Sequence, residues 1–197
     1  MRLGIFGGSF DPVHNGHLAL ARACQRQAAL DEVWFMPTAV QPLKKTGPRA
    51  SDAERVEMLR LATGDEPTWR VCTLEIDRGG MSYTIDTVRQ LHAELLEASL
   101  FFCIGSDALR DVAHWKEPRA IFQLVAPLVV HRAGEPQPDL AALAGLCAPE
   151  MQPALVEMAA TDISSTEIRR RVPIGESIEH FVPGAVANYI AERGLYR

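Results

Sequence analysis

Short apolar segments alternate along this chain with longer stretches in which apolar residues recur at the spacing of an α-helix. We expect strands at residues 3–6, 33–36, 71–76, 100–104, 124–131 and 155–160. We expect helices at residues 16–28, 52–63, 84–96, 107–113, 118–122 and 185–193, with a further short helix after Ser165. Nearly continuous apolar strands separated by helices are typical of a parallel sheet covered on both faces. The sequence therefore predicts a doubly wound α/β fold, with a mostly parallel sheet and helices on both faces.

Several element boundaries carry local signals. Ser51 and Glu54 have the spacing of a capping box at the start of a helix. Gly194 is a natural end for the last predicted helix. Residues 133–153 are rich in Ala, Pro and Gly, and we interpret them as an excursion over the surface. With 197 residues and no internal repeat, the chain is predicted to form one Rossmann-like domain, residues 1–197.

Charge, cysteine content and hydropathy exclude several classes of protein. The net charge of −5 argues against a general nucleic-acid binder, which would show a basic stripe. The four cysteines lie far apart and form no C-x-x-C pair, so we expect no structural zinc site. Free thiols fit a reducing cytoplasm, and no segment is apolar for as long as a signal peptide or a transmembrane helix requires. We expect a cytoplasmic protein without nucleic-acid or membrane partners, and a homo-oligomer is compatible with the sequence.

The loop after the first predicted strand is where a doubly wound sheet is expected to bind its ligand. This loop, residues 7–17, has the sequence Gly-Gly-Ser-Phe-Asp-Pro-Val-His-Asn-Gly-His. The two leading glycines let main-chain amides approach a ligand without a Cβ in the way. His14 and His17 straddle the start of the next helix, so both rings can face its anion-binding N-terminus. The same residues also fit a pair of helix-capping histidines, or two ligands of a zinc site for which no third ligand is obvious.

A second helix start follows the last predicted strand. Residues 163–169 have the sequence Ile-Ser-Ser-Thr-Glu-Ile-Arg, in which Ser164 or Ser165 is a natural N-cap. Arg169 lies one turn into this helix and can reach a phosphate in the same cleft. The plain alternative is a capped surface helix whose run of arginines is solvated.

Together, the two strings resemble the G-[ST]-F-D-P-x-H-x-G-H and I-S-[SA]-T-x-I-R motifs of the nucleotidyltransferase superfamily, in the same order along the chain. The resemblance implies that His14, His17 and Arg169 are catalytic and act on the phosphates of ATP. It also implies that Asp107 serves the ATP ribose, although its position also suits a helix cap. The full set of implied ATP-binding residues is Gly7, Gly8, Ser9, Phe10, Gly105, Asp107, Ile163, Ser164, Ser165 and Thr166.

Within this superfamily the chain looks like a bacterial nicotinate-mononucleotide adenylyltransferase. The likeness covers nearly the whole chain and includes residues 82–84, 104–109, 115 and 194–197. It implies that Trp115 stacks on the pyridine ring, since a flat electron-poor ring favours an aromatic face. It also implies that main-chain amides near Thr84 hold the nicotinate carboxylate, and that Arg132 lies near the nucleotide phosphate. On the residues alone, Trp115 also fits a half-buried core position and Arg132 a solvated strand end.

The segment after the second predicted strand departs from the family pattern. The family has P-x-x-x-P-P-H-[KR], whereas residues 37–45 are Pro-Thr-Ala-Val-Gln-Pro-Leu-Lys-Lys. Leu43 replaces the family His, Gln41 replaces a Pro, and Lys44 keeps the positive charge. We interpret Lys44 as a residue that binds the nicotinate nucleotide, and Lys45 as a second ammonium group within reach of a phosphate. On the residues alone, both lysines also fit a mobile loop in which their side chains are solvated.

The resemblance therefore implies transfer of the adenylyl group of ATP to nicotinate mononucleotide, giving deamido-NAD and pyrophosphate. Mg²⁺ is the expected cofactor, bound with ATP, because no cluster in the sequence resembles a metal cage built from protein ligands alone. Alternatives are an adenylyltransferase for nicotinamide mononucleotide or phosphopantetheine, and a non-catalytic nucleotide sensor on the same scaffold.

Overall fold

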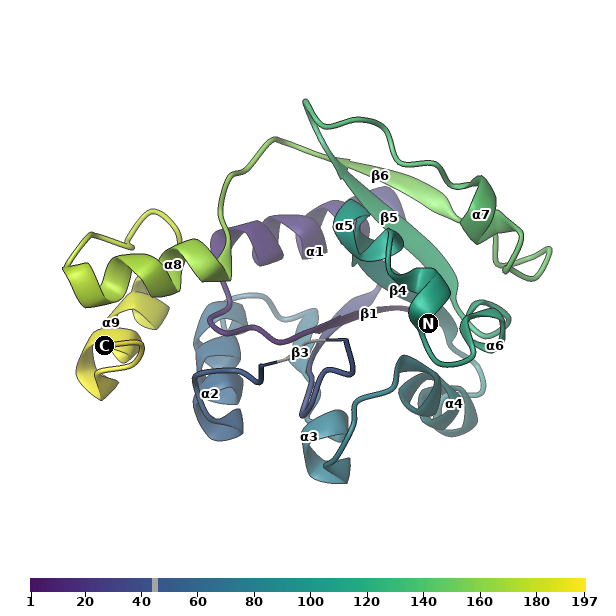
Figure 1. Cartoon of the computed structure of the whole chain (residues 1–197). Coiled ribbons are helices and arrows are strands. Elements are labelled where there is room, and N and C mark those ends of the chain that lie inside the picture. The colour runs from purple at the N-terminus through teal and green to yellow at the C-terminus, as the bar shows by residue number, and fades with distance from the viewer. Residues whose placement is uncertain (44–45) are drawn as a thin grey trace.

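One parallel sheet forms the centre of the molecule in the computed structural model, which describes residues 1–43 and 46–197 (Figure 1). The strands are β1 (Arg2–Gly8), β2 (Glu32–Pro37), β3 (Trp69–Val71), β4 (Ser99–Gly105), β5 (Ala126–Arg132) and β6 (Ala154–Met158). Their order in the sheet is β3-β2-β1-β4-β5-β6, and every neighbouring pair is parallel. The order changes direction between β1 and β4, which is the position where such sheets bind ligands.

Helices cover both faces of the sheet, as the sequence predicts. The α-helices are α1 (Asn15–Gln27), α2 (Asp52–Thr63), α3 (Leu74–Arg78), α4 (Thr84–Glu94), α5 (Ser106–Leu109), α6 (Pro118–Phe122), α7 (Ala141–Ala144), α8 (Ser165–Arg171) and α9 (Gly184–Arg193). Buried side chains of α1, α2, α8 and α9 join one hydrophobic cluster, and those of α4, α6 and α7 join a second. The doubly wound α/β fold is confirmed.

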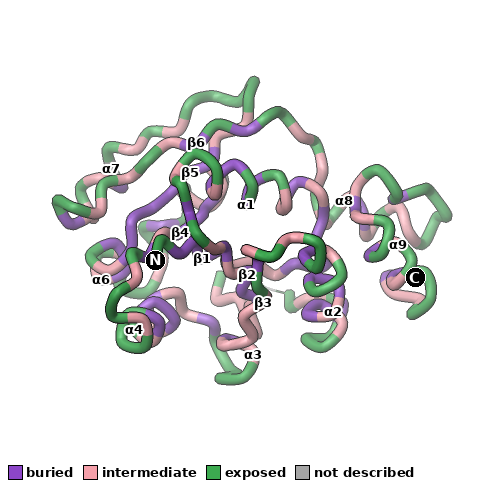
Figure 2. Tube along the Cα trace, turned by 180° about the vertical axis from the view of Figure 1, so that it is seen from behind, coloured by how far each residue is buried: buried purple, intermediate pink, exposed green. Residues whose placement is uncertain are grey.

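Alternate residues of the strands supply the two hydrophobic clusters. In β4, Cys103 belongs to the first cluster, whereas Phe102 and Ile104 belong to the second. In β5, Leu128 and Val129 divide in the same way. Successive side chains of a strand point to opposite faces, so both faces must be apolar and the strand becomes an almost continuous apolar run. Figure 2 shows the resulting buried centre of the trace.

The predicted helix boundaries have the expected local causes. The Ser51 hydroxyl accepts a hydrogen bond from the Glu54 main-chain N–H, and the Glu54 carboxylate accepts one from Ser51 N–H, which completes the capping box of α2. Gly194 follows α9 with φ = 63°, a left-handed conformation that suits glycine. Residues 133–153 are mostly exposed or half-buried and contain the short helix α7, in agreement with a surface excursion.

Two predicted elements were wrong in part. The strand predicted at residues 71–76 ends at Val71, and Leu74–Arg78 form α3 instead. Within the described residues, β3 is an edge strand whose sole partner is β2. Few hydrogen bonds therefore hold it in the sheet, and a short apolar run fits a helix as well as a strand. The helix predicted at 107–113 divides into α5 and a 3-10 turn at Val112–His114.

Among the residues that the structure describes, no helix is long and apolar enough to cross a membrane.

Candidate active site

The predicted phosphate-binding loop lies at the carboxyl end of β1 and leads directly into α1. The rings of His14 and His17 stack at the start of this helix, with 3.6 Å between their centroids and 22° between their planes. Gly16 makes this stack feasible, because a Cβ at that position would lie 3.1 Å from His14 Nδ1. The two histidines that the sequence singles out are therefore adjacent and face the same helix N-terminus.

The main chain fixes which nitrogen of each histidine carries the proton. The His17 N–H donates to His14 Nδ1 at 3.3 Å, and the His14 N–H donates to His17 Nδ1 at 3.2 Å. A ring nitrogen that accepts a hydrogen bond carries no proton, so the proton of each neutral ring is on Nε2. Burial, and then the charge of Arg132, lower the pKa of His14 from 6.5 to about 4. At neutral pH His14 is therefore an uncharged Nε2–H donor.

The start of α8 meets the same loop. Ser164 is the N-cap, since its hydroxyl accepts from Glu167 N–H, and the Ser165 hydroxyl donates to the Pro12 carbonyl at 2.9 Å. Arg169 Nη1 donates to the Asp11 carbonyl, and its Nη2 donates to Thr166 Oγ1 at 3.3 Å. The carbonyl of Ile163 lies beside Gly16 of α1. The two motifs, more than 140 residues apart, thus meet at the carboxyl end of β1.

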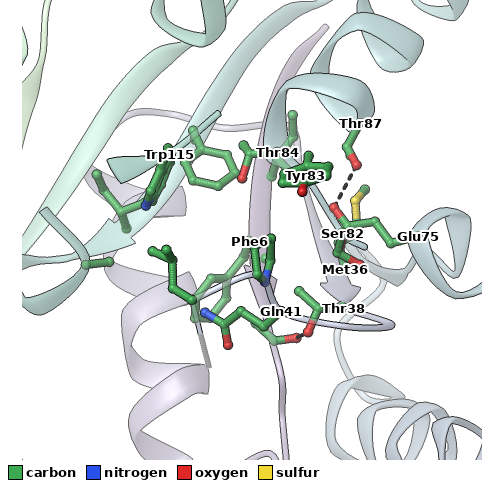
Figure 3. Close-up of a pocket in the computed structure, with 18 of the residues that line it drawn as sticks. Phe6, Met36, Thr38, Gln41, Glu75, Ser82, Tyr83, Thr84, Thr87 and Trp115 are labelled. Atoms are coloured by element: carbon green, nitrogen blue, oxygen red, sulfur yellow. Dashed lines mark hydrogen bonds between the residues drawn. The ribbon is translucent and has the colours of Figure 1, made fainter. Parts of the chain in front are cut away.

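A cavity opens next to this loop, between the carboxyl ends of β1 and β4 (Figure 3). Gly7, Gly8 and Gly105 line it at the strand ends. Trp115 lies on its wall, 5.8 Å from the ring of Phe102 and 6.3 Å from that of Phe122, centroid to centroid. Trp115 is half-buried. Its indole therefore packs on the core and lines the cavity at the same time. A half-buried core position and a role in contacting a ligand ring, the two interpretations of Trp115 from the sequence, are thus compatible.

Thr84 lines the cavity as the first residue of α4. The preceding residue, Tyr83, makes no side-chain capping bond to the first turn of that helix. The first N–H groups of a helix have no partner within it, and they carry its partial positive charge. This helix start is suited to a carboxylate on a ligand in the cavity. Nearby, the Lys116 ammonium pairs with Asp86 at 3.2 Å and lies 4.4 Å from the centroid of the Tyr83 ring.

The cavity also contains a buried carboxyl group that the sequence reasoning missed. Thr87 Oγ1 donates to Glu75 Oε1 at 2.7 Å, and Arg78 donates to the same hydroxyl. Burial raises the pKa of Glu75, and its Oε2 has no hydrogen-bond partner among the described residues. Glu75 lies within the run that was predicted as a strand, so no sequence signal set it apart from a solvent-facing position.

The loop after β2 forms the other wall. The Ser9 hydroxyl donates to Gln41 Oε1 at 3.1 Å, so the residue that replaces a family Pro joins this loop to the phosphate-binding loop. Arg55 of α2 is fully buried and donates to the carbonyls of Ser9 and Thr38, each at 2.7 Å. Sequence reasoning missed Arg55, because in the sequence it resembles a solvent-facing residue of an amphipathic helix.

Some predicted site residues have other surroundings. The Phe10 ring is buried and packs edge-on against Phe6, so only the main chain of Phe10 can reach a ligand. Arg132, at the end of β5, pairs with Glu135 at 3.4 Å and acts on His14 through its charge, and it does not line the cavity of Trp115 and Thr84. Lys44 and Lys45 lie outside the described residues. Asp107 lies in α5, and its side chain is also outside the described part.

Comparison with known sequences gives the family. The sequence model of the family described as cytidylyltransferase-like matches residues 5–171. A protein of Citrifermentans bemidjiense, described as a probable nicotinate-nucleotide adenylyltransferase, is 40% identical, with 100% of this chain and 98% of that protein covered. A protein of Thermus thermophilus with the same description is 42% identical over 100% of both chains. The chain belongs to the cytidylyltransferase-like family and, within it, to the nicotinate-nucleotide adenylyltransferases.

Solved structures of this family share the fold. A Plasmodium falciparum structure, described as nicotinic acid mononucleotide adenylyltransferase complexed with NaAD, superposes with a TM-score of 0.82 at 20% identity, covering 99% of this chain and 97% of that one. A structure from Vibrio parahaemolyticus, described as a putative nicotinate-nucleotide adenylyltransferase, gives 0.70 at 17% identity, covering 100% and 95%. The predicted family and enzyme class are confirmed, and the roles of individual residues stay predictions.

Proposed function

We propose that this protein catalyses transfer of the adenylyl group of ATP to the phosphate of nicotinate mononucleotide. A phosphate oxygen of the mononucleotide forms a bond to the α-phosphorus of ATP, the bond from that phosphorus to the bridging oxygen breaks, and pyrophosphate leaves. The product is deamido-NAD. The attacking phosphate is ionised at neutral pH and needs no general base.

One observation carries this proposal most directly. The stacked Nε2–H donors at the start of α1 lie beside a cavity that has an indole on its wall and the uncapped start of α4 at its edge. Such a site offers a place for a polyphosphate and, next to it, a place for a flat ring that bears an anion. The family relatives, at 40–42% identity over at least 98% of their length, carry the same assignment in their descriptions.

The side chains would act by holding and stabilising charge. His14 and His17 would donate through Nε2 to phosphate oxygens that become more negative in the transition state, and Arg169 would place a permanent positive charge beside them. The main chain of residues 7–10 and of 163–166 would hold the triphosphate, and residues 105–107 the ribose. Trp115 and the start of α4 would orient the pyridine ring, with Arg132 and Lys44 near the mononucleotide phosphate. Orientation then contributes much of the rate increase.

Mg²⁺ would accompany ATP as an ion bound to the triphosphate. The described residues contain no group of three or more His, Cys, Asp or Glu side chains that could hold a metal ion. Mg²⁺ commonly binds through substrate phosphates in this way. We assign it no protein ligands.

The choice between the acid and the amide of the pyridine ring follows from the start of α4. Its N–H groups would pair with both oxygens of a nicotinate carboxylate, whereas the NH₂ of nicotinamide would place donor against donor. We expect nicotinate mononucleotide to be used about 5- to 150-fold more efficiently than nicotinamide mononucleotide, since leaving a buried polar group unpaired costs about 1–3 kcal/mol.

Pyrophosphate release tests the function. The enzyme is incubated with ATP and Mg²⁺, together with nicotinate mononucleotide, nicotinamide mononucleotide, phosphopantetheine or no acceptor, and kcat/KM is measured for each. The proposal requires rapid release with the first acceptor and formation of deamido-NAD. Equal kcat/KM for the acid and the amide would contradict the role of the α4 start, and release only with phosphopantetheine would replace the proposed acceptor. Binding of ATP without release in any arm would indicate a nucleotide sensor.

We also propose a reducing, cytoplasmic location for the reaction. All four cysteines are free, and Cys24 and Cys103 are buried. A hydrogen bond with Cys24, and then burial, raise the pKa of Cys103, which keeps its thiol protonated and inert.

A further inference from the structure

Tyr196 contacts the phosphate-binding loop from the other end of the sequence. Its hydroxyl donates to Asp11 Oδ1 at 2.8 Å, across 185 positions. The ring is buried in the first hydrophobic cluster, and the segment after α9 turns back toward the loop through Gly194 and Tyr196, both of which have positive φ. Figure 1 shows this end of the chain beside α8 and α9, on the side of the sheet that carries α2.

Asp11 is held by three uncharged donors. Its Oδ1 accepts from Tyr196 and from Ala50 N–H at 3.1 Å, and its Oδ2 accepts from Arg49 N–H at 2.8 Å. The residue is only 5% exposed, so its carboxylate has lost nearly all contact with water. These three bonds fix the plane of the carboxylate and compensate part of its desolvation.

Arg169 contacts the same residue. Its Nη1 donates to the Asp11 carbonyl and lies 3.7 Å from Asp11 Oδ2, beyond hydrogen-bond distance. The guanidinium is therefore anchored at the loop without forming a close ion pair. A carboxylate with fewer donors would turn toward the nearest cation, and the guanidinium would then be withdrawn from a phosphate in the cleft.

We infer that Tyr196 is a positioning residue for Arg169: its hydroxyl fixes the Asp11 carboxylate, and Asp11 sets where the guanidinium stands at the phosphate end of the cleft. The inference rests on the proposed function and on the role given there to Arg169. Burial and the charge of Asp11 raise the pKa of Tyr196, so the hydroxyl keeps its proton and remains a donor throughout the physiological pH range.

The first test replaces only the hydroxyl. Tyr196→Phe keeps the buried ring, and it is expected to lower kcat by about 10-fold, the scale of one hydrogen bond to a charged group, while KM for nicotinate mononucleotide changes less than about 2-fold. Tyr189→Phe is the matched control, because Tyr189 is only half-buried and contacts Arg193 on the surface of α9. This control should keep the kcat of the wild type. Both are assayed at a temperature at which circular dichroism shows them folded.

A double-mutant cycle separates positioning from general destabilisation. In an Arg169→Ala background, adding Tyr196→Phe should change kcat by less than about 2-fold, because the group through which the hydroxyl acts is gone. A wild-type kcat for Tyr196→Phe overturns the inference, and so does an undiminished 10-fold loss in the Arg169→Ala background. A wild-type kcat for Arg169→Ala would instead contradict the proposed role of Arg169, and absence of pyrophosphate release by the wild type would contradict the proposed function.

Discussion

The two ends of the candidate site, the phosphate-binding loop with its stacked histidines and the cavity lined by Trp115, are held in place by different forces. At the phosphate end, directional hydrogen bonds dominate: Asp11 accepts three of them, and the buried Arg55 donates to the carbonyls of Ser9 and Thr38. At the other end, Trp115 is held by packing on Phe102 and Phe122 and remains half-buried.

The difference follows from what each end has to bind. Charge stabilisation at a reacting phosphorus depends steeply on the position of each donor, so its donors need a rigid setting. A flat ring gains most of its binding energy from contact area, which tolerates small displacements. Substitutions at the phosphate end should therefore have large effects on kcat or on stability, and those at the ring end should have smaller effects on KM.

The largest effect is expected for His17→Ala. Loss of one transition-state donor should lower kcat by about 10²–10³-fold in the pyrophosphate assay. His92→Ala, an exposed histidine of α4, is the control and should turn over normally. Near-normal turnover of His17→Ala would leave the stacked histidines with only the capping role, and the proposed contrast between the two ends would fail.

Arg55→Met tests the rigidity of the phosphate end directly. It removes the buried guanidinium that donates to the carbonyls of Ser9 and Thr38 and pairs with Asp52 at 2.6 Å, and we expect the free energy of unfolding to fall by about 3 kcal/mol in urea titrations. Arg60→Met on the same helix is the control, because the Arg60 side chain is 63% exposed and pairs only loosely with Glu57. Equal stability of the two variants would mean that the buried guanidinium contributes nothing to this end of the cleft.

The pH dependence of stability gives a third measure of the phosphate end. His14 has a pKa of about 4 in the folded protein and about 6.5 when unfolded, so between these values the unfolded chain binds more protons and stability falls as the pH falls. Between pH 7 and pH 5, proton uptake by His14 on unfolding should lower the free energy of unfolding by about 2 kcal/mol. His14→Asn retains a capping side chain without an imidazole, and its loss of stability over the same range should be smaller by that amount. If His14→Asn loses as much stability between pH 7 and pH 5 as the wild type does, His14 does not become protonated on unfolding.

The smallest effect belongs to the ring end. Trp115→Ala should raise KM for nicotinate mononucleotide by about 2- to 12-fold, equivalent to about 0.5–1.5 kcal/mol of aromatic contact, and leave KM for ATP nearly unchanged. Trp115→Phe, which retains an aromatic face, should lie between that variant and the wild type. If Trp115→Ala unfolds or loses affinity for ATP, Trp115 is mainly a core residue and does not serve as a platform for the pyridine ring. The proposed difference between the phosphate end and the ring end would then fail.

The sequence by itself predicted the parts of the molecule that depend on neighbouring residues. Apolar runs marked the strands, because each buried strand has to be apolar on both faces. The three-residue spacings at His14 and His17 and at Ser51 and Glu54 gave the helix starts, because residues three apart meet in the first turn.

Only the tertiary structure decided which distant polar groups meet. Nothing near Tyr196 in the sequence indicates that its hydroxyl reaches Asp11, and nothing near Arg55 indicates that its charge is buried. The helix at Leu74–Arg78 lies where the sequence predicted a strand, because a short apolar run fits either element. Hydrophobic periodicity is a local property of the chain. The burial of a polar side chain instead becomes favourable only when its hydrogen-bond partners, here supplied by segments up to 185 residues away, have been brought beside it by folding.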